Sequence, residues 1–262
     1  MIEELKYFLL GLIQGLAEFF PISSSGHIVL FSNLIDLSSN HPLLLSIVVH
    51  FATTLSTIIV YKKRIFNTLK GVMCQSHESV SFVTKIIVSS LPIVIVGILF
   101  REKIEFVFNH STQLVALMLT LTGLMLVFNH KQTTPKKHIN YMDALLMGVA
   151  QSIAILPGIS RSGATISMAL LCKIDRKKAA EFSFLMVLLP IIGITIIELI
   201  ILLSSSINLK SSEIYGLIIA FFSAFISGLF ACRYMIRLVQ NNNLKYFGYY
   251  CILVGFFFIL LY

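Results

Sequence analysis

Two short polar stretches interrupt an otherwise apolar chain: "FPISSSGH" (Phe20–His27) and "PGISRSGAT" (Pro157–Thr165). Serine and histidine side chains can attack phosphorus or move protons, and a glycine–serine turn exposes backbone N–H groups that bind anions. Both stretches fall where a membrane helix ought to continue, and irregular backbone at that depth is tolerated only if it is buried in protein or lines a wet cavity. We therefore expect the two stretches to form one polar site.

The second stretch is suited to an anion. The guanidinium of Arg161 is a planar fork that matches phosphate oxygens, and a helix expected from about Ala164 would point its positive end at the same place. An arginine in the middle of a bilayer costs about 2.5–3.5 kcal/mol on insertion scales, so we expect it to have a partner. We favour a bound anion as that partner. The alternative is an internal ion pair with Glu18 that pins the two stretches together.

The first stretch and the helix before it offer an amide, a carboxylate and a nucleophile. Gln14 and Glu18 are four residues apart and share one helical face. They would suit a divalent cation such as Mg²⁺, which typically uses one or two carboxylates together with phosphate oxygens. A helix–helix hydrogen bond is an equal alternative for Gln14. His27 follows Ser24 by three residues, within reach as its base if the turn folds back. Two alternatives stay open: His27 itself attacks phosphorus, or it activates water.

These side chains belong to an integral membrane protein. Of the 262 residues, 57% are hydrophobic and only 12% are charged, whereas a soluble domain needs roughly 25% charged residues. The net charge of +8 does not indicate nucleic-acid binding, because the basic residues lie in short clusters between apolar segments, as in cytoplasmic loops. The four cysteines have no metal-binding spacing and are interpreted as small apolar residues.

The hydrophobic pattern predicts six membrane-spanning helices and two broken ones. Spanning the hydrocarbon takes about 20 apolar residues. Regions 5–37 and 143–172, approximately, are apolar at both ends and polar in the middle, so each is either one long helix or a hairpin that leaves on the side from which it entered. The six expected spans are Leu43–Tyr61, Val80–Phe100, Gln113–Phe128, Phe182–Leu203, Ile214–Tyr234 and Tyr246–Leu261.

The distribution of lysine and arginine favours the hairpins. With both broken regions re-entrant, the loops on one side hold fourteen of these residues and the opposite side holds four, which is the cytoplasmic excess of the positive-inside rule. The N-terminus is then outside, the first hairpin dips in from outside and the second dips in from the cytoplasm. The four expected cytoplasmic loops are 62–79, 129–142, 173–181 and 233–245.

The two hairpins resemble each other. Residues 11–26, shifted by 137, fall on 148–163 without a gap, and seven of the sixteen positions are identical. Similar hairpins that enter from opposite faces indicate an inverted-topology repeat with its site near the midplane. The expected fold is an all-α integral membrane protein with six full transmembrane helices and two re-entrant hairpins, in repeats of about 1–128 and 129–262. The identical pairs are Gly11/Gly148, Gln14/Gln151, Ala17/Ala154, Ile22/Ile159, Ser23/Ser160, Ser25/Ser162 and Gly26/Gly163.

Together, "QGLAEFFPISSSGH" (Gln14–His27) and "PGISRSGAT" are similar to the two motifs of the bacterial undecaprenyl-diphosphatases, also called bacitracin-resistance proteins. The resemblance runs the length of the chain and includes "AAEFSFLM" (Ala179–Met186). It implies an enzyme that hydrolyses a C55 polyprenyl diphosphate to the monophosphate and inorganic phosphate, which recycles the lipid carrier of peptidoglycan synthesis and confers bacitracin resistance. It also implies interlocking inverted repeats and a multi-pass location in the bacterial plasma membrane, with the site open to the outer face.

The same resemblance implies cofactors, partners and site residues. The expected cofactor is Mg²⁺ or Ca²⁺, and the expected partners are the lipid diphosphate and the bilayer, with no nucleic acid; a homodimer is left open. Gln14 stands where many family members have glutamate, so the main role as metal ligand falls on Glu18. The expected catalytic residues are Glu18, Ser24, His27 and Arg161, and the expected metal ligands are Glu18 and Gln14. The expected substrate-binding residues are Ser23, Ser25, Gly26, Ser160, Arg161, Ser162, Gly163 and Thr165.

Transport is the rival function. Inverted repeats and broken helices at the midplane are also what secondary transporters show, so the alternative is a polyprenyl-phosphate flippase or an anion transporter on the same scaffold. Transport needs an anion site but no nucleophile beside a base. The presence of both Ser24 and His27 therefore favours hydrolysis.

Overall fold

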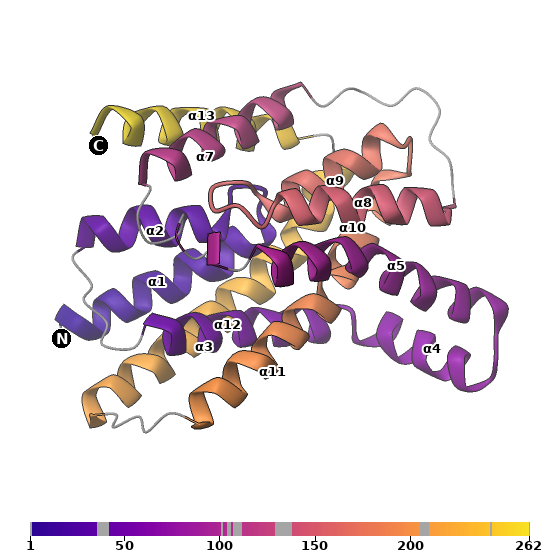
Figure 1. Cartoon of the computed structure of the whole chain (residues 1–262), viewed down its shortest axis with the longest axis horizontal. Coiled ribbons are helices and arrows are strands. Elements are labelled where there is room, and N and C mark those ends of the chain that lie inside the picture. The colour runs from indigo at the N-terminus through magenta and orange to yellow at the C-terminus, as the bar shows by residue number, and fades with distance from the viewer. Residues whose placement is uncertain are drawn as a thin grey trace.

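The computed structural model describes residues 2–35, 42–100, 102–103, 106, 112–128, 138–204, 210–241 and 243–261. Over these ranges the regular structure is helical, with no β-strand. Figure 1 shows most helices running roughly along the long axis of the molecule, while α4 and the start of α5 project at one end. The helices are α1 (Ile2–Phe19), α2 (Ser24–Ile35), α3 (Pro42–Val60), α4 (Lys62–Met73), α5 (His77–Leu99), α7 (Thr112–Val127), α8 (Tyr141–Ile153), α9 (Arg161–Leu171), α10 (Arg176–Met186), α11 (Leu188–Ser204), α12 (Ser211–Gln240) and α13 (Leu244–Leu261).

Several of these helices can cross a membrane. Within the described ranges, α5, α12, α13 and the segment Arg176–Ile201 of α10 and α11 are each long and apolar enough. Helix α3 passes the same test together with α4, from which it is bent by 74°, and α7 is a shorter apolar helix. Apolar side chains such as Leu91, Ile98 and Leu253 are more than half exposed on these helices, as contact with lipid tails allows. The chain is a multi-pass membrane protein.

Each broken region of the sequence folds as a helical hairpin. Helices α1 and α2 pack against each other, and so do α8 and α9. In Figure 1 the first hairpin opens at the end where the N-terminus lies and the second opens at the opposite end. Their tips meet, because the Ser162 hydroxyl donates to the Phe20 carbonyl oxygen at 3.3 Å and a Cβ on Gly26 would lie 3.0 Å from the Cα of Gly158. The two polar stretches therefore lie side by side.

Backbone chemistry explains where the hairpins turn. Pro21 has no N–H with which to continue α1. Two residues later, Ser23 turns the chain with a φ of 66°, in the left-handed region that few L residues adopt. In the second hairpin the positive φ, 96°, falls on Gly158, where a Cβ would collide with the carbonyl oxygen of Val115. Glycine is therefore required at this turn both for its conformation and for the close approach of α7.

Glycines also let the hairpins pack on the helices of the other half of the chain. Helix α1 packs on α12, and α8 packs on α5. A Cβ at Gly11 would collide with the carbonyl oxygen of Ala220, and a Cβ at Gly148 would collide with that of Ser89. Small residues permit such backbone approach between membrane helices. The hairpin of each half of the chain thus packs on a long helix of the other half.

Several expected boundaries are wrong. The loop expected over 62–79 contains α4, and α12 continues six residues beyond the expected end of its span, to Gln240. The loop expected over 173–181 ends early, because the Asp175 side chain accepts from the backbone N–H groups of Lys177 and Lys178 and caps α10. Helix α9 begins at Arg161 rather than about Ala164. Hydrophobicity marks where a helix leaves the apolar layer, whereas capping side chains decide where it begins or ends.

Candidate active site

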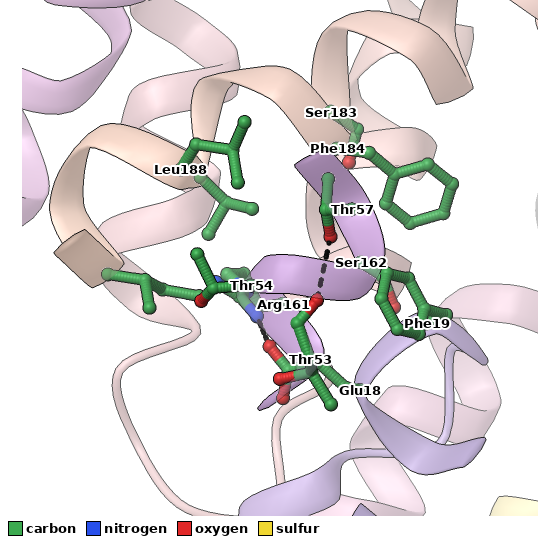
Figure 2. A pocket seen from close by; sticks show the side chains of 12 residues that line it. Glu18, Phe19, Thr53, Thr54, Thr57, Arg161, Ser162, Ser183, Phe184 and Leu188 are labelled. Carbon is green, nitrogen blue, oxygen red and sulfur yellow. Dashed lines mark hydrogen bonds and ion pairs between the residues drawn. The ribbon is translucent and has the colours of Figure 1, made fainter. Parts of the chain in front are cut away.

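An ion pair joins the two hairpin tips. Glu18 is the last residue but one of α1, and Arg161 is the first residue of α9. The terminal nitrogen Nη2 of Arg161 donates to Glu18 Oε1, and the Glu18 side chain is only 5% exposed (Figure 2). A charge in a membrane interior needs such a partner. Of the two partners that the sequence left open for Arg161, the structure shows the internal one, which we had favoured less. Anion binding by Arg161 stays a prediction.

The second oxygen of the Glu18 carboxylate receives two further donors. Gln14 Nε2 lies 2.9 Å from Glu18 Oε2, across one turn of α1. The Ser24 hydroxyl, at the start of α2, donates to the same oxygen at 2.8 Å. A hydroxyl held this way is oriented by the group that can take its proton. The structure therefore pairs the Ser24 hydroxyl with the Glu18 carboxylate, an arrangement that suits a nucleophile and its base.

His27 lies apart from this pair. Its Nδ1 is 2.9 Å from the carbonyl oxygen of Ser23, which can only accept, so Nδ1 carries the proton. Its Nε2 accepts from the Tyr250 hydroxyl at 2.8 Å, and the ring stacks on Phe31 and Tyr250 and is 2% exposed. The expected contact between His27 and Ser24 is therefore wrong, because both imidazole nitrogens have other partners. A catalytic role for His27 stays a prediction.

A narrow pocket opens beside the ion pair. Glu18, Arg161 and Ser162 line it from the hairpins, and apolar side chains of α10 and α11 close one side. Figure 2 shows three threonines of α3 facing the ion pair, and Ser183 of α10 completes the polar lining. The threonines are Thr53, Thr54 and Thr57.

Helix α3 and Tyr250 also contact these side chains, and neither contact was predicted from the sequence. His50 of α3, to which the sequence assigned no role, has its Nε2 4.0 Å from Glu18 Oε2. A signal was present, because polar residues recur three or four positions apart in this apolar span and so mark one polar face. These residues are Ser46, His50, Thr53, Thr54 and Thr57. Tyr250, in contrast, lies 223 positions from His27, and no local pattern connects the two.

The serines and glycines expected to bind substrate build two similar helix caps. The Ser23 hydroxyl accepts from the Gly26 N–H at 3.2 Å at the start of α2. In the same way, the Ser160 hydroxyl accepts from the Gly163 N–H at 3.1 Å at the start of α9. The serines two positions after each cap, Ser25 and Ser162, lie 3.4 and 3.2 Å from the capping hydroxyls. Residues that are identical in the two hairpins thus make the same local structure.

Thr165 lies one turn into α9 and is buried. Its hydroxyl is 2.6 Å from the hydroxyl of Ser183, a residue of the pocket wall, and it also donates to the Arg161 carbonyl oxygen at 2.8 Å. Thr165 therefore does not line the pocket but contacts two residues that do, Ser183 and Arg161.

The oxygen atoms of Gln14 and Glu18 could supply part of the coordination of a divalent cation. Gln14 Oε1 is buried and has no hydrogen-bond partner among the described residues, and it belongs to the side chain that contacts the Glu18 carboxylate. Amide and carboxylate oxygens are ligands for Mg²⁺ and Ca²⁺. Across the described ranges no group of three or more His, Cys, Asp or Glu side chains could hold a metal ion. The remaining ligands would have to be phosphate oxygens and water.

Comparison with known proteins identifies the family. Residues 7–257 match the family model described as bacitracin resistance protein BacA. The chain is similar to a protein of Christiangramia forsetii named undecaprenyl-diphosphatase, with 43% identity over 94% of this chain and 93% of the relative. Relatives of the same name from Bacteroides fragilis (strain YCH46) and Methanococcus maripaludis (strain C6) are 38% and 36% identical, over 97% and 95% of this chain and 96% of each relative. The resemblance seen in the two motifs is confirmed: the chain belongs to the bacitracin resistance protein BacA family.

Proposed function

We propose that this protein is a membrane phosphatase that hydrolyses undecaprenyl diphosphate to undecaprenyl phosphate and inorganic phosphate. The names of its relatives supply the substrate, and the observation that carries the chemistry is the Ser24 hydroxyl donating to Glu18 beside Arg161. This reaction regenerates the lipid carrier for peptidoglycan synthesis and accounts for bacitracin resistance.

Arg161 and the start of α9 would hold the diphosphate. A guanidinium has five N–H donors, and a single carboxylate oxygen uses few of them. The first turn of a helix leaves backbone N–H groups without intrahelical partners, and these favour an anion. The pocket beside the ion pair brings both features together with the threonine hydroxyls of α3. The ion pair keeps the net charge of the pocket close to zero before substrate binds, and the arriving phosphate would share the guanidinium with Glu18.

Ser24 would attack the terminal phosphorus while Glu18 takes its proton. A bond forms between Ser24 Oγ and phosphorus, and the bond from phosphorus to the bridging oxygen breaks, so that undecaprenyl phosphate leaves. Water then attacks the phosphorus of the phosphoserine, and the bond from phosphorus to Ser24 Oγ breaks. Glu18 returns its proton to Ser24 Oγ, and the released phosphate carries the protons of the water. Arg161 would stabilise the charge on the phosphoryl oxygens throughout, which is the main catalytic task in phosphoryl transfer.

A cation held by Glu18 and Gln14 together with phosphate oxygens would neutralise further charge on the diphosphate. We propose Mg²⁺ or Ca²⁺ for this place. The residues that carry the proton transfers remain Ser24 and Glu18.

We further propose that the site opens to the outer face of the bacterial plasma membrane, with the first hairpin entering from outside and the second from the cytoplasm. The hairpins that open at opposite ends of the molecule and the fourteen-to-four distribution of basic residues support this orientation.

The test is phosphate release from farnesyl and undecaprenyl diphosphates by the purified protein, with and without a chelator. The wild type is expected to release one phosphate per diphosphate and to leave the monophosphate intact. Ser24→Ala is expected to lower turnover by about 10²-fold or more. Ser212→Ala, which removes a hydroxyl from an exposed position of α12, is the matched control.

Each outcome separates the candidate functions. A correctly inserted wild-type protein that releases no phosphate from either substrate would overturn the proposal in favour of transport. Phosphate release that persists in Ser24→Ala at the wild-type rate would keep the reaction but remove Ser24 as its nucleophile.

A further inference from the structure

A second cavity lies away from the ion pair, where α4 meets α5 and α10. It has a volume of about 500 Å³ and is lined by residues of these helices and of the segment before α8. Two phenylalanines form part of its wall, Phe82 and Phe182, whose rings meet edge to face at 5.8 Å. Charged and titratable side chains surround them: Arg64, Lys85, Lys178, His77, His138, Glu78 and Glu181. An apolar wall with a charged rim suits a ligand that has both an apolar part and a charged part.

The charges in this cavity leave a positive surplus. Arg64 and Glu181 neutralise each other, because Arg64 Nε lies 2.8 Å from Glu181 Oε1, and the guanidinium also sits 4.6 Å from the centre of the Phe82 ring. Lys85 and Lys178 add two further positive charges to the lining, and Glu78 adds one further negative charge. With the two histidines neutral, the net charge of the lining is therefore +1, and an anion is the complementary ligand.

The cavity lies where α5 changes from charged to apolar. Apart from His77 at its start, Glu78 and Lys85 are the only acidic or basic residues of α5, and the helix continues from Ile86 to Leu99 without a charge. Immediately beyond Lys85, Ile87 and Leu91 are 47% and 51% exposed. A lysine at such a boundary lies at the level of the lipid phosphates, and the exposed apolar residues beyond it lie beside the lipid tails.

Helix α4 has the composition of a helix that lies on a membrane surface. Phe66, Leu69 and Met73 are 66%, 57% and 85% exposed, and their spacing of three and four residues puts them on one face. Basic residues at Lys62, Lys63 and Lys70 accompany this apolar face. A basic amphipathic helix binds at the interface of an anionic membrane. The sharp bend between α3 and α4 allows this orientation.

We propose that this cavity binds the phosphate of an anionic membrane lipid, with Lys85 and Lys178 as the cations and the acyl chains lying along the exposed side of α5. Basic pockets between transmembrane helices recognise lipid headgroups in this way. Inorganic phosphate shares the headgroup's chemistry, but the phenylalanine wall and the adjoining apolar side of α5 favour the lipid. The site is separate from the ion pair of Glu18 and Arg161 and does not depend on the reaction proposed there.

Native mass spectrometry of the purified protein tests this proposal. The protein is mixed with equal amounts of phosphatidylglycerol, which is anionic, and phosphatidylcholine, which is zwitterionic. The wild type is expected to retain one molecule of phosphatidylglycerol in preference to phosphatidylcholine. The double variant Lys85→Gln/Lys178→Gln is expected to bind it about tenfold more weakly. The matched control is Lys62→Gln/Lys63→Gln, which removes the same charge from residues of α4 that do not line the cavity.

The outcomes distinguish specific binding of the lipid in this cavity from non-specific electrostatic attraction of anionic lipid to the protein. Equal loss of phosphatidylglycerol in the control and in the cavity variant would overturn the proposal, and so would its displacement by inorganic phosphate at comparable concentration. Lys85→Arg keeps the charge and is expected to retain the lipid, which guards against misfolding in the double variant. Loss of the lipid in a Lys85→Arg protein that unfolds at the wild-type temperature would also contradict the proposal.

Discussion

The carboxylate of Glu18 accepts hydrogen bonds from three side chains, and each sets a different property. Gln14 fixes the orientation of the carboxylate, and Ser24 presents the proton that the carboxylate would remove. Arg161 supplies the opposite charge. Residue types and spacing were sufficient to single out these four positions. They were not sufficient to pair Ser24 with Glu18 rather than with His27, because the partner that His27 has instead, Tyr250 of α13, lies 223 positions away in the sequence.

Glu18→Gln changes charge at nearly constant shape, so it separates the roles of Glu18 and Gln14. We expect Glu18→Gln to lower turnover by about 10²–10⁴-fold, because it removes the proposed base, and to weaken the dependence on Mg²⁺ and Ca²⁺. Gln14→Ala is expected to cost much less, because position 14 is already neutral. Phosphate release is measured against metal concentration for both variants. A Glu18→Gln protein that titrates with metal like the wild type would show that Glu18 is not a ligand.

Arg161→Lys tests whether the guanidinium serves the substrate as well as Glu18. Lysine keeps the charge, and with it an ion pair to Glu18, but loses the planar fork for phosphate. We therefore expect a folded, inserted protein with substantially reduced turnover. Near-normal turnover in the phosphate-release assay would reduce Arg161 to a structural counter-ion.

Tyr250→Phe removes the hydroxyl that donates to His27 Nε2 and keeps the ring that stacks on the imidazole. We expect a loss of stability of about 1–3 kcal/mol, because a buried acceptor is left without its donor. Tyr249→Phe removes a hydroxyl from the neighbouring position and is the control. Thermal unfolding in detergent measures both, and equal unfolding temperatures for the two variants would contradict the assigned hydrogen bond.

Among the elements, the hairpins were predicted best and their packing partners least. Broken hydrophobicity around Pro21 and Pro157 located both hairpins, and apolar length located the helices α3, α5, α7, α12 and α13. Helix α4 was expected to be a loop, because its lysines resemble those of a cytoplasmic connection and only part of its surface is apolar. Nothing local in the sequence indicates that α1 packs on α12 or α8 on α5, since these contacts join distant segments.

Gly148→Val tests the contact between α8 and α5. Any Cβ at Gly148 would collide with the backbone of Ser89, so the two helices would have to move apart. We expect destabilisation of about 1–3 kcal/mol, which is usual for overpacking. Gly193→Val is the control, because a Cβ at Gly193 in α11 meets nothing within 4 Å. The unfolding temperatures in detergent are compared, and a Gly148→Val protein as stable as the control would mean that α8 and α5 do not approach so closely.

For the molecule as a whole, the orientation in the membrane is the main prediction. Single cysteines are introduced at Lys63 and Lys177 in a protein without its native cysteines. Both are expected to be protected from a membrane-impermeant reagent in intact cells, because they lie in two of the four expected cytoplasmic loops, which hold most of the lysine and arginine. A cysteine at Ser212 is expected to react. Labelling at Lys177 together with protection at Lys63 would place the two positions on opposite sides and rule out the re-entrant second hairpin.

The ion pair between the hairpin tips also bears on how the protein is made. Glu18 and Arg161 are 143 positions apart, and a chain is synthesised from its N-terminus. The first hairpin therefore reaches the membrane long before its counter-charge exists, and an acidic side chain without a partner is costly there. The hairpin can settle into its final place only after the second has arrived. A nascent chain that stops short of Arg161 would consequently remain loosely inserted and become a substrate for the cell's membrane proteases.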